Sequence, residues 1–178
     1  MSLKFCYTFG DNFCVLTSPL KEEVEQSLGY ELTEEQFYNF TKSFIPEGAT
    51  GVRELSAEEH IAAANSYRKY REAWCDVSED EKINVDMTKA KECALTRLRD
   101  MRQESFVDLG FPNKLNPDLE EAVIPLETRT KLQELRDVTE PLKAIDTAGK
   151  YDDDALLAQF DQLSDKQVLD AIVEGANG

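Results

Sequence analysis

Histidine is nearly absent from this sequence, since His60 is the single one among 178 residues. Catalysis that uses histidine as a base, and metal sites that need several imidazoles, are therefore disfavoured. The four cysteines never form C-x-x-C, so we expect no zinc site and predict reduced thiols rather than a disulfide framework. Gly-rich phosphate loops and G-x-S-x-G are also missing. These absences predict no enzyme activity, no cofactor and no bound metal.

Positively charged residues are also few in this chain. The chain has 20 Lys and Arg against 36 Asp and Glu, which gives a formal net charge of -16 and a pI near 4.4. Binding to a phosphate backbone needs clustered Lys and Arg, so direct nucleic-acid binding is not expected. No apolar run approaches the roughly 18–20 residues of a membrane span, and Met1–Thr17 has no signal-peptide pattern. With 41% hydrophobic residues, the chain can still build a core.

A β-hairpin is predicted at the start. Leu3–Phe9 and Asn12–Thr17 are rich in aromatic and β-branched residues, and Gly10-Asp11 between them suits a type II′ turn. The cross-strand pairs in this register are Phe5–Leu16 and Tyr7–Cys14. An isolated hairpin is marginal in water. The hairpin is therefore either a strand pair in the core or an edge that pairs with a partner protein.

Helical signals dominate the remainder. Capping boxes begin at Thr33 and Ser56, and proline or glycine ends most of the periodic segments. Helices are expected at Leu20–Leu28, Thr33–Phe44, Ser56–Trp74, Thr88–Leu109 and Leu126–Thr139, with an extended segment at Ile83–Met87 and a turn at Asn113–Glu121. The fold class is thus mainly α with a small N-terminal β-hairpin (α+β), and an antiparallel helical hairpin in the second half.

Breaks in the pattern suggest a division into parts. Pro46, Gly48 and Gly51 mark a loop after a possible attachment module, residues 1–50. A helical domain follows at 51–150, and a C-terminal helical segment at 151–178 has an end that should fray. The acidic triplet Asp152–Asp154 does not match the EF-hand template, so it is interpreted as a helix start. The two short helices beyond it either close the fold or dock on a neighbour.

Aromatic residues recur at helical spacing. Phe37, Phe40 and Phe44 form one stripe, and Tyr67 and Trp74 lie on another. Such stripes usually pack in a core, but together they carry more apolar area than a thin helical domain hides. We therefore expect part of this area to be buried between chains, in a homo-oligomer or multi-copy assembly. The candidate interface residues are Phe5, Tyr7, Phe37, Phe40, Phe44, Tyr67 and Trp74.

Motifs in the second half occur in a recognisable order. They are the stretches Tyr70–Trp74 (YREAW), Ile83–Ala90 (INVDMTKA), Arg99–Arg102 (RDMR) and Lys131–Thr139 (KLQELRDVT). This order resembles a widespread group of small proteins of tailed bacteriophages, with the pattern R-x-A-W, V-D-M-x-K-A, R-x-x-R and K-Q-x-L-R-D-V-T. The resemblance covers Tyr70 to Ala148. Two departures are Leu132, which separates Lys131 from Gln133, and the loop 110–124, which lacks the usual Asp-containing stretch.

The resemblance implies a role but no catalytic residues. Such proteins are encoded among phage structural genes, and some are similar to tail-fibre assembly chaperones. A non-enzymatic virion protein of the tail, neck or fibres is therefore expected, assembled in the host cytoplasm with other phage structural proteins as partners. The alternatives are an assembly chaperone that is not retained in the particle, and an acidic inhibitor or nucleic-acid mimic.

Charged residues of the predicted helical hairpin suggest a polar latch. Arg136 could clamp a carboxylate of the facing helix, and Asp137 could accept from Arg99 or Arg102. Such a latch would fix the register of the two helices. The alternative is that these residues are solvated surface ions that contribute little.

Overall fold

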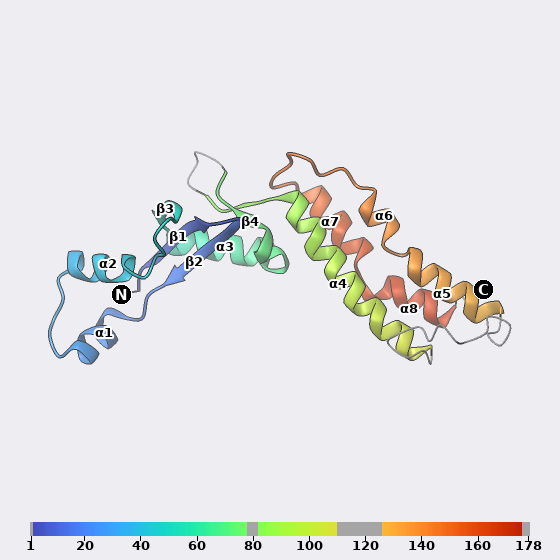
Figure 1. Ribbon diagram of the computed structural model, residues 1–178, viewed down its shortest axis with the longest axis horizontal. Coiled ribbons are helices and arrows are strands. Elements are labelled where there is room, and N and C mark those ends of the chain that lie inside the picture. The colour runs from blue at the N-terminus through green and yellow to red at the C-terminus, as the bar shows by residue number, and fades with distance from the viewer. Residues whose placement is uncertain (1, 78–81, 110–125, 176–178) are drawn as a thin grey trace. The chain divides into compact units, whose positions relative to one another are not determined.

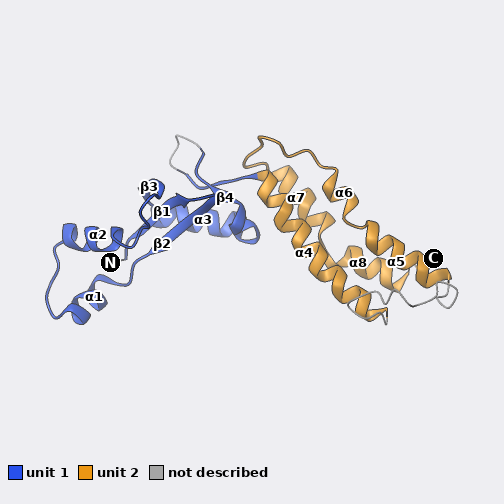
Figure 2. Cartoon of the chain, in the orientation of Figure 1, with its two compact units in different colours: residues 1–86 blue, residues 87–178 orange. Residues whose placement is uncertain are grey.

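The computed structural model describes residues 2–77, 82–109 and 126–175 (Figure 1). The chain divides into two compact units, unit 1 (Met1–Asp86) and unit 2 (Met87–Gly178) (Figure 2). Unit 1 contains the β-strands and short helices, and unit 2 is helical in its described residues. The expected fold class, mainly α with a small N-terminal β part, is confirmed. The predicted turn at Asn113–Glu121 lies outside the described residues.

The predicted hairpin forms with the expected register. Strands β1 (Lys4–Phe9) and β2 (Asn12–Thr17) are antiparallel, and Phe5 pairs with Leu16 and Tyr7 with Cys14. Gly10 has φ +60°, whereas Asp11 has no positive φ, as a type II′ turn requires. The hairpin is therefore part of a folded unit and not a free ribbon.

A third strand, β3 (Thr50–Glu54), pairs antiparallel with β1 and gives the sheet order β2-β1-β3. The pairing shifts register between Cys6 and Thr8, where Gly51 (φ +61°) and its neighbour lie opposite one residue of β1. This is a bulge that needs a glycine in the left-handed region. Because β3 belongs to this sheet, the loop at residues 46–51 does not separate two parts as expected; the units divide at Asp86.

Two helices cover one face of the sheet. Helix α1 (Lys21–Leu28) ends at Gly29, which has φ +79°, and α2 (Glu34–Lys42) begins at the predicted capping box of Thr33. The ring of Phe5 meets that of Tyr38 edge to face, with centroids 5.0 Å apart. The buried residues of this core are Leu3, Phe5, Val24, Leu32 and Phe37.

The opposite face of the sheet carries α3 (Ala57–Tyr67), which is linked to β1 by a contact between Lys4 and His60. The helix is shorter than predicted: a 3₁₀ segment, η1 (Arg68–Ala73), follows with a kink at Tyr70. Trp74 then begins strand β4 (Trp74–Cys75), which pairs with β5 (Asn84–Val85). The extended character predicted near residue 83 is confirmed.

Unit 2 is built around one long helix, α4 (Met87–Asp108). The other helices among its described residues are α5 (Leu126–Asp137), α6 (Glu140–Lys143), α7 (Asp154–Leu163) and α8 (Lys166–Glu174). Helix α8 packs against both α4 and α5, and α7 packs against α4 and α6. Their apolar sides close the core, in which Leu98, Leu135 and Phe160 are completely buried. The C-terminal helices therefore close the fold of unit 2 itself.

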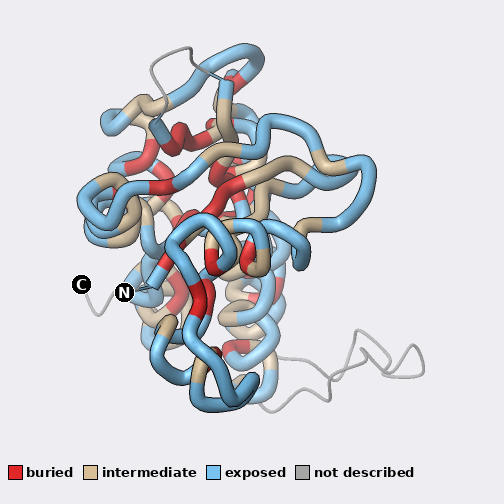
Figure 3. Tube along the Cα trace, turned by 90° about the vertical axis from the view of Figure 1, so that its left-hand side faces the viewer, coloured by how far each residue is buried: buried red, intermediate tan, exposed pale blue. Residues whose placement is uncertain are grey.

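The predicted helical pair is present in a modified form. Helices α4 and α5 run antiparallel and touch (Figure 1), but α4 makes its larger contacts with α7 and α8. In Figure 3 the buried positions form short stretches separated by exposed ones, as amphipathic elements require. No helix in the described part of the chain is both long and apolar enough to span a bilayer.

Candidate functional site

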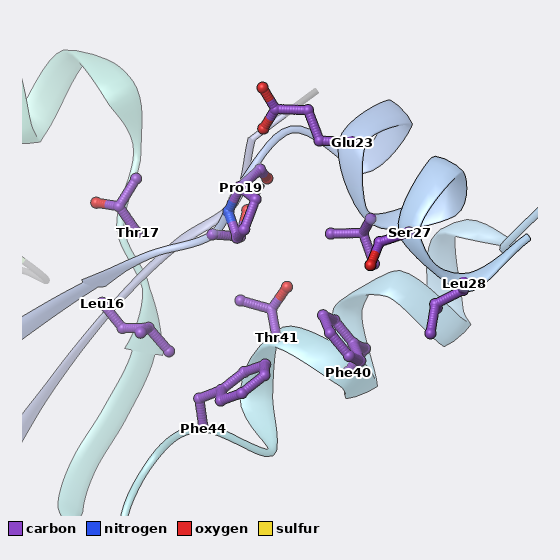
Figure 4. Close-up of a pocket in the computed structure, with 11 residues that line it drawn as sticks. Leu16, Thr17, Pro19, Glu23, Ser27, Leu28, Phe40, Thr41 and Phe44 are labelled. Carbon is purple, nitrogen blue, oxygen red and sulfur yellow. Dashed lines mark hydrogen bonds between the residues drawn. The ribbon is translucent and has the colours of Figure 1, made fainter.

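An apolar groove opens in unit 1 where the end of β2, helix α1 and helix α2 meet. Its volume is about 450 Å³. Leu16, Phe40 and Phe44 line one part of it, and Leu28 of α1 lies next to Phe40, on the side away from Phe44 (Figure 4). The remaining lining residues are Thr17, Ser18, Pro19, Glu23, Val24, Ser27 and Thr41. The groove is therefore mainly hydrocarbon in character.

The groove is open because the aromatic stripe of Phe37, Phe40 and Phe44 continues past the end of α2 at Lys42, beyond the part that the sheet covers. Phe37 is completely buried, but Phe44 is 58% exposed. The rings of Phe40 and Phe44 meet edge to face with centroids 5.1 Å apart, which fixes the exposed ring on the groove wall. On α1, Val24 is buried and Leu28 is 40% exposed. The apolar side chains of Phe44 and Leu28 thus remain accessible to solvent in the groove.

Acidic side chains occur in the first turns of the two helices that border this groove. The first turns of α1 and α2 carry Glu22, Glu23, Glu34 and Glu35. The ammonium group of Lys21 is already engaged, at 2.8 Å from Glu34 and 3.7 Å from Glu25. Glu23 is the carboxylate that lines the groove, whereas Glu34 and Glu35 lie at the opposite end of α2 from Phe40 and Phe44.

A second hollow, of about 460 Å³, lies on the α3 side of the sheet. Its lining includes the cationic side chains of Arg68 and Arg71 and the imidazole of His60 around Trp74, and contains no carboxylate. The other lining residues are Val15, Thr17, Ala64 and Asn65. We call this hollow the basic pocket.

The imidazole of His60 is held in one orientation. Lys4 Nζ lies 2.8 Å from His60 Nδ1, and the ring meets Trp74 edge to face with centroids 6.2 Å apart. Burial, with the positive charges of Lys4 and Arg71, lowers the pKa of His60 below its usual 6.5. The ring is therefore neutral near pH 7, with Nδ1 accepting from Lys4 and the proton on Nε2. Arg71 lies 6.0 Å from the centroid of the Trp74 ring, a cation–π contact.

Next to α3, Arg53 joins separate parts of unit 1. Its Nη1 and Nη2 donate to Glu59 at 2.9 and 2.7 Å, and its Nε donates to Asp76 at 3.0 Å. These bonds raise the pKa of Arg53, so the guanidinium stays charged and ties β3 to α3 and to the end of β4. Burial raises the pKa of the neighbouring Cys6 thiol to about 11, so this cysteine is a poor nucleophile at neutral pH.

The predicted interface residues are distributed unevenly. Phe40 and Phe44 line the groove, whereas Phe5, Phe37 and Trp74 are buried within unit 1. Tyr7 and Tyr67 are half-buried, and the carbonyl of Tyr67 accepts from Trp74 Nε1 at 3.3 Å. The helices and sheet of the chain itself cover most of the area that we expected between chains, so only the end of the first stripe remains available.

The predicted latch forms a different set of contacts. Asp137 accepts from Gln133 of its own helix at 2.9 Å, and Arg136 is exposed and lies 3.5 Å from Gln133 Oε1. Arg102 Nη1 reaches the backbone carbonyl of Arg136 at 3.4 Å, and Arg99 pairs loosely with Glu92 at 4.0 Å. The latch is corrected accordingly: Arg102 reaches from α4 to α5 through a long bond to a backbone carbonyl, and the side chains of Arg136 and Asp137 are solvated.

Other polar contacts hold unit 2 together. Lys131 Nζ donates to the carbonyl of Val173 at 2.9 Å, near the end of α8, and Arg97 lies 3.4 Å from Asp161 of α7. Lys91 Nζ donates to the carbonyl of Ile145 at 3.0 Å. Lysine near a helix C-terminus also favours the macrodipole. These residues link α4 and α5 to segments that sequence spacing alone does not place beside them.

Neither hollow was predicted from the sequence. Pro19 and Leu28 belong to the groove through tertiary packing, and Arg68 and Arg71 face one pocket because α3 gives way to η1. Within residues 2–77, 82–109 and 126–175, no group of three or more His, Cys, Asp or Glu side chains is placed to hold a metal ion. Comparison of the chain with protein-family models, curated proteins and solved structures finds no match.

Proposed function

We propose that this protein is a non-enzymatic structural or assembly protein of a tailed bacteriophage, which binds another phage protein through the apolar groove of unit 1. The observation that carries the proposal is the accessible aromatic wall of the groove, where Phe44 is 58% exposed beside Phe40. Exposed aromatic side chains in a concave surface are typical anchors of protein interfaces. The order of motifs from Tyr70 to Ala148 supports the phage assignment.

The charge around the groove indicates the kind of partner segment. Glu23 places a carboxylate in the lining of the groove, and the chain as a whole carries a formal charge of -16. A complementary segment presents apolar side chains flanked by Lys or Arg, because opposite charges at the rim steer encounter and fix orientation. The occupant is therefore a basic, amphipathic segment of a tail, neck or fibre protein.

Binding can be tested by co-expression of the tagged chain with each structural protein of the same phage. We expect one tail, neck or fibre protein to co-purify with the wild-type chain. Phe44→Glu should weaken this binding at least about tenfold, because a carboxylate placed in an apolar contact is left unpaired. Ile61→Glu is the matched control, since Ile61 is 55% exposed in the same unit and does not line the groove.

Two results would contradict the proposal: no structural protein co-purifies, or Phe44→Glu and Ile61→Glu bind equally well. Mass spectrometry of purified particles then distinguishes a virion component from an assembly chaperone. A virion component remains in the particle at a fixed stoichiometry, whereas an assembly chaperone binds its partner in infected cells and is missing from the particle.

A further inference from the structure

The basic pocket has a composition unlike that of the rest of the chain. The protein carries a formal charge of -16, yet the eight residues that line this hollow include two arginines and a histidine and no acid. Lys4 adds a further positive charge behind the imidazole, 2.8 Å from Nδ1. A local positive field therefore lies in a concave site of a strongly acidic molecule.

The cations of the pocket are available to a ligand. Arg68 and Arg71 are exposed, and in the described part of the chain neither has a carboxylate within ion-pair distance. By contrast, Arg53 in the same unit is held by two carboxylates. Guanidinium groups without an acidic partner offer fork-shaped donors for an oxyanion.

The neutral imidazole adds a directed donor. Because Nδ1 of His60 accepts from Lys4, the ring proton is on Nε2, and the imidazole that lines the pocket is a hydrogen-bond donor. Trp74, which is 3% exposed, gives the pocket a rigid floor, and Arg71 rests against its ring. The donors therefore surround a preformed hollow of about 460 Å³, a volume typical of small-molecule sites.

We propose that the basic pocket binds a small multivalent oxyanion, one that carries clustered phosphate or carboxylate groups, between Arg68, Arg71 and His60. This site is separate from the apolar groove and does not depend on the proposed phage function. The long-range repulsion from the acidic surface is largely screened at physiological ionic strength, where the Debye length is about 8 Å. The local donors then decide the binding.

The chain supplies its own reporters for a test, because Trp74 is the single tryptophan and His60 the single histidine. The full-length protein is titrated with sodium pyrophosphate and, separately, with tricarballylate, at a constant ionic strength of about 0.15 M set with NaCl. We expect a saturable change in tryptophan fluorescence and a matching shift of the imidazole NMR signals with at least one probe. If only pyrophosphate binds, the ligand is a phosphate compound, and if only tricarballylate binds, it is a carboxylate compound. Binding of both probes supports recognition of the chemistry that the two oxyanions share.

Variants assign the binding to the pocket. The double variant Arg68→Gln/Arg71→Gln should bind at least tenfold more weakly, whereas Arg68→Lys/Arg71→Lys should retain part of the affinity because it retains the charge. The double variant Arg99→Gln/Arg136→Gln, which changes two exposed arginines of unit 2, is the control for net charge and should bind as the wild type does. The proposal is overturned if neither probe gives a saturable change, if NaCl alone reproduces it, or if the Gln/Gln variant binds as tightly as the wild type.

Discussion

A comparison of Phe37 with Phe44 tests whether the first lies in the closed core of unit 1 and the second on the wall of the open groove. Phe37 is completely buried between the sheet and the helices, so Phe37→Ala should lower the free energy of unfolding by about 3–5 kcal/mol. Phe44, on the same stripe, is 58% exposed and mainly contacts Phe40. Loss of that ring pair and partial burial should cost only about 1 kcal/mol.

Urea unfolding followed by Trp74 fluorescence measures this difference, because the single tryptophan reports on unit 1 and not on unit 2. With a slope of about 1–3 kcal/mol per M, Phe37→Ala should lower the midpoint by about 1–5 M urea. The Phe44→Ala midpoint should stay within about 1 M of the wild type. Equal losses for the two variants, or a Phe37→Ala midpoint like that of the wild type, would refute the division into a closed core and an open groove.

Three further outcomes are expected. Leu135→Ala should destabilise unit 2 by about 2–5 kcal/mol, because this side chain is completely buried, whereas the exposed Arg136→Gln should melt within about 0.5 kcal/mol of the wild type when helical circular dichroism is followed. The pKa of His60 in the folded protein lies below its unfolded value of 6.5, so the unfolded chain binds more protons as the pH falls below 6.5. The free energy of unfolding should therefore decrease as the pH drops from 6.5 toward the folded pKa. His60→Asn should reduce this fall in urea midpoints measured between pH 7.5 and 5. Cys6, with a pKa near 11, should react with a thiol reagent at pH 8 much more slowly than the half-buried Cys14, and equal rates would contradict its burial.

Local sequence signals predicted the elements of this fold well. The Gly10-Asp11 pair specified the hairpin register, and the capping box of Thr33 placed the start of α2 correctly. The start and end of α4 were also predicted to within a residue. In each case the signal is contained in neighbouring residues, so no tertiary information is needed.

The remaining features depend on contacts between distant residues. Strand β3 is short, contains Gly51 and has no apolar alternation, so its pairing with β1 left no local signature. The helix at Ser56 was expected to continue to Trp74, but the β4–β5 pairing takes that residue into a strand. The two hollows arise from these same tertiary contacts, which explains why residue spacing could not locate them.

The packing of α8 against α4 determines when each half of the chain can fold during synthesis. Strand β3 and its partners lie within the first 86 residues, so unit 1 can close while the ribosome still translates the second half. Helix α4 must wait for Leu169 and the rest of α8, which are made well after α4 itself. At about 5–20 residues per second, its apolar side, including Ala94 and Leu98, stays uncovered for roughly 4–16 s until α8 is complete at Glu174. During each round of translation the nascent chain thus exposes the apolar face of α4 after unit 1 has folded. Ribosome-associated chaperones can bind this face during that interval.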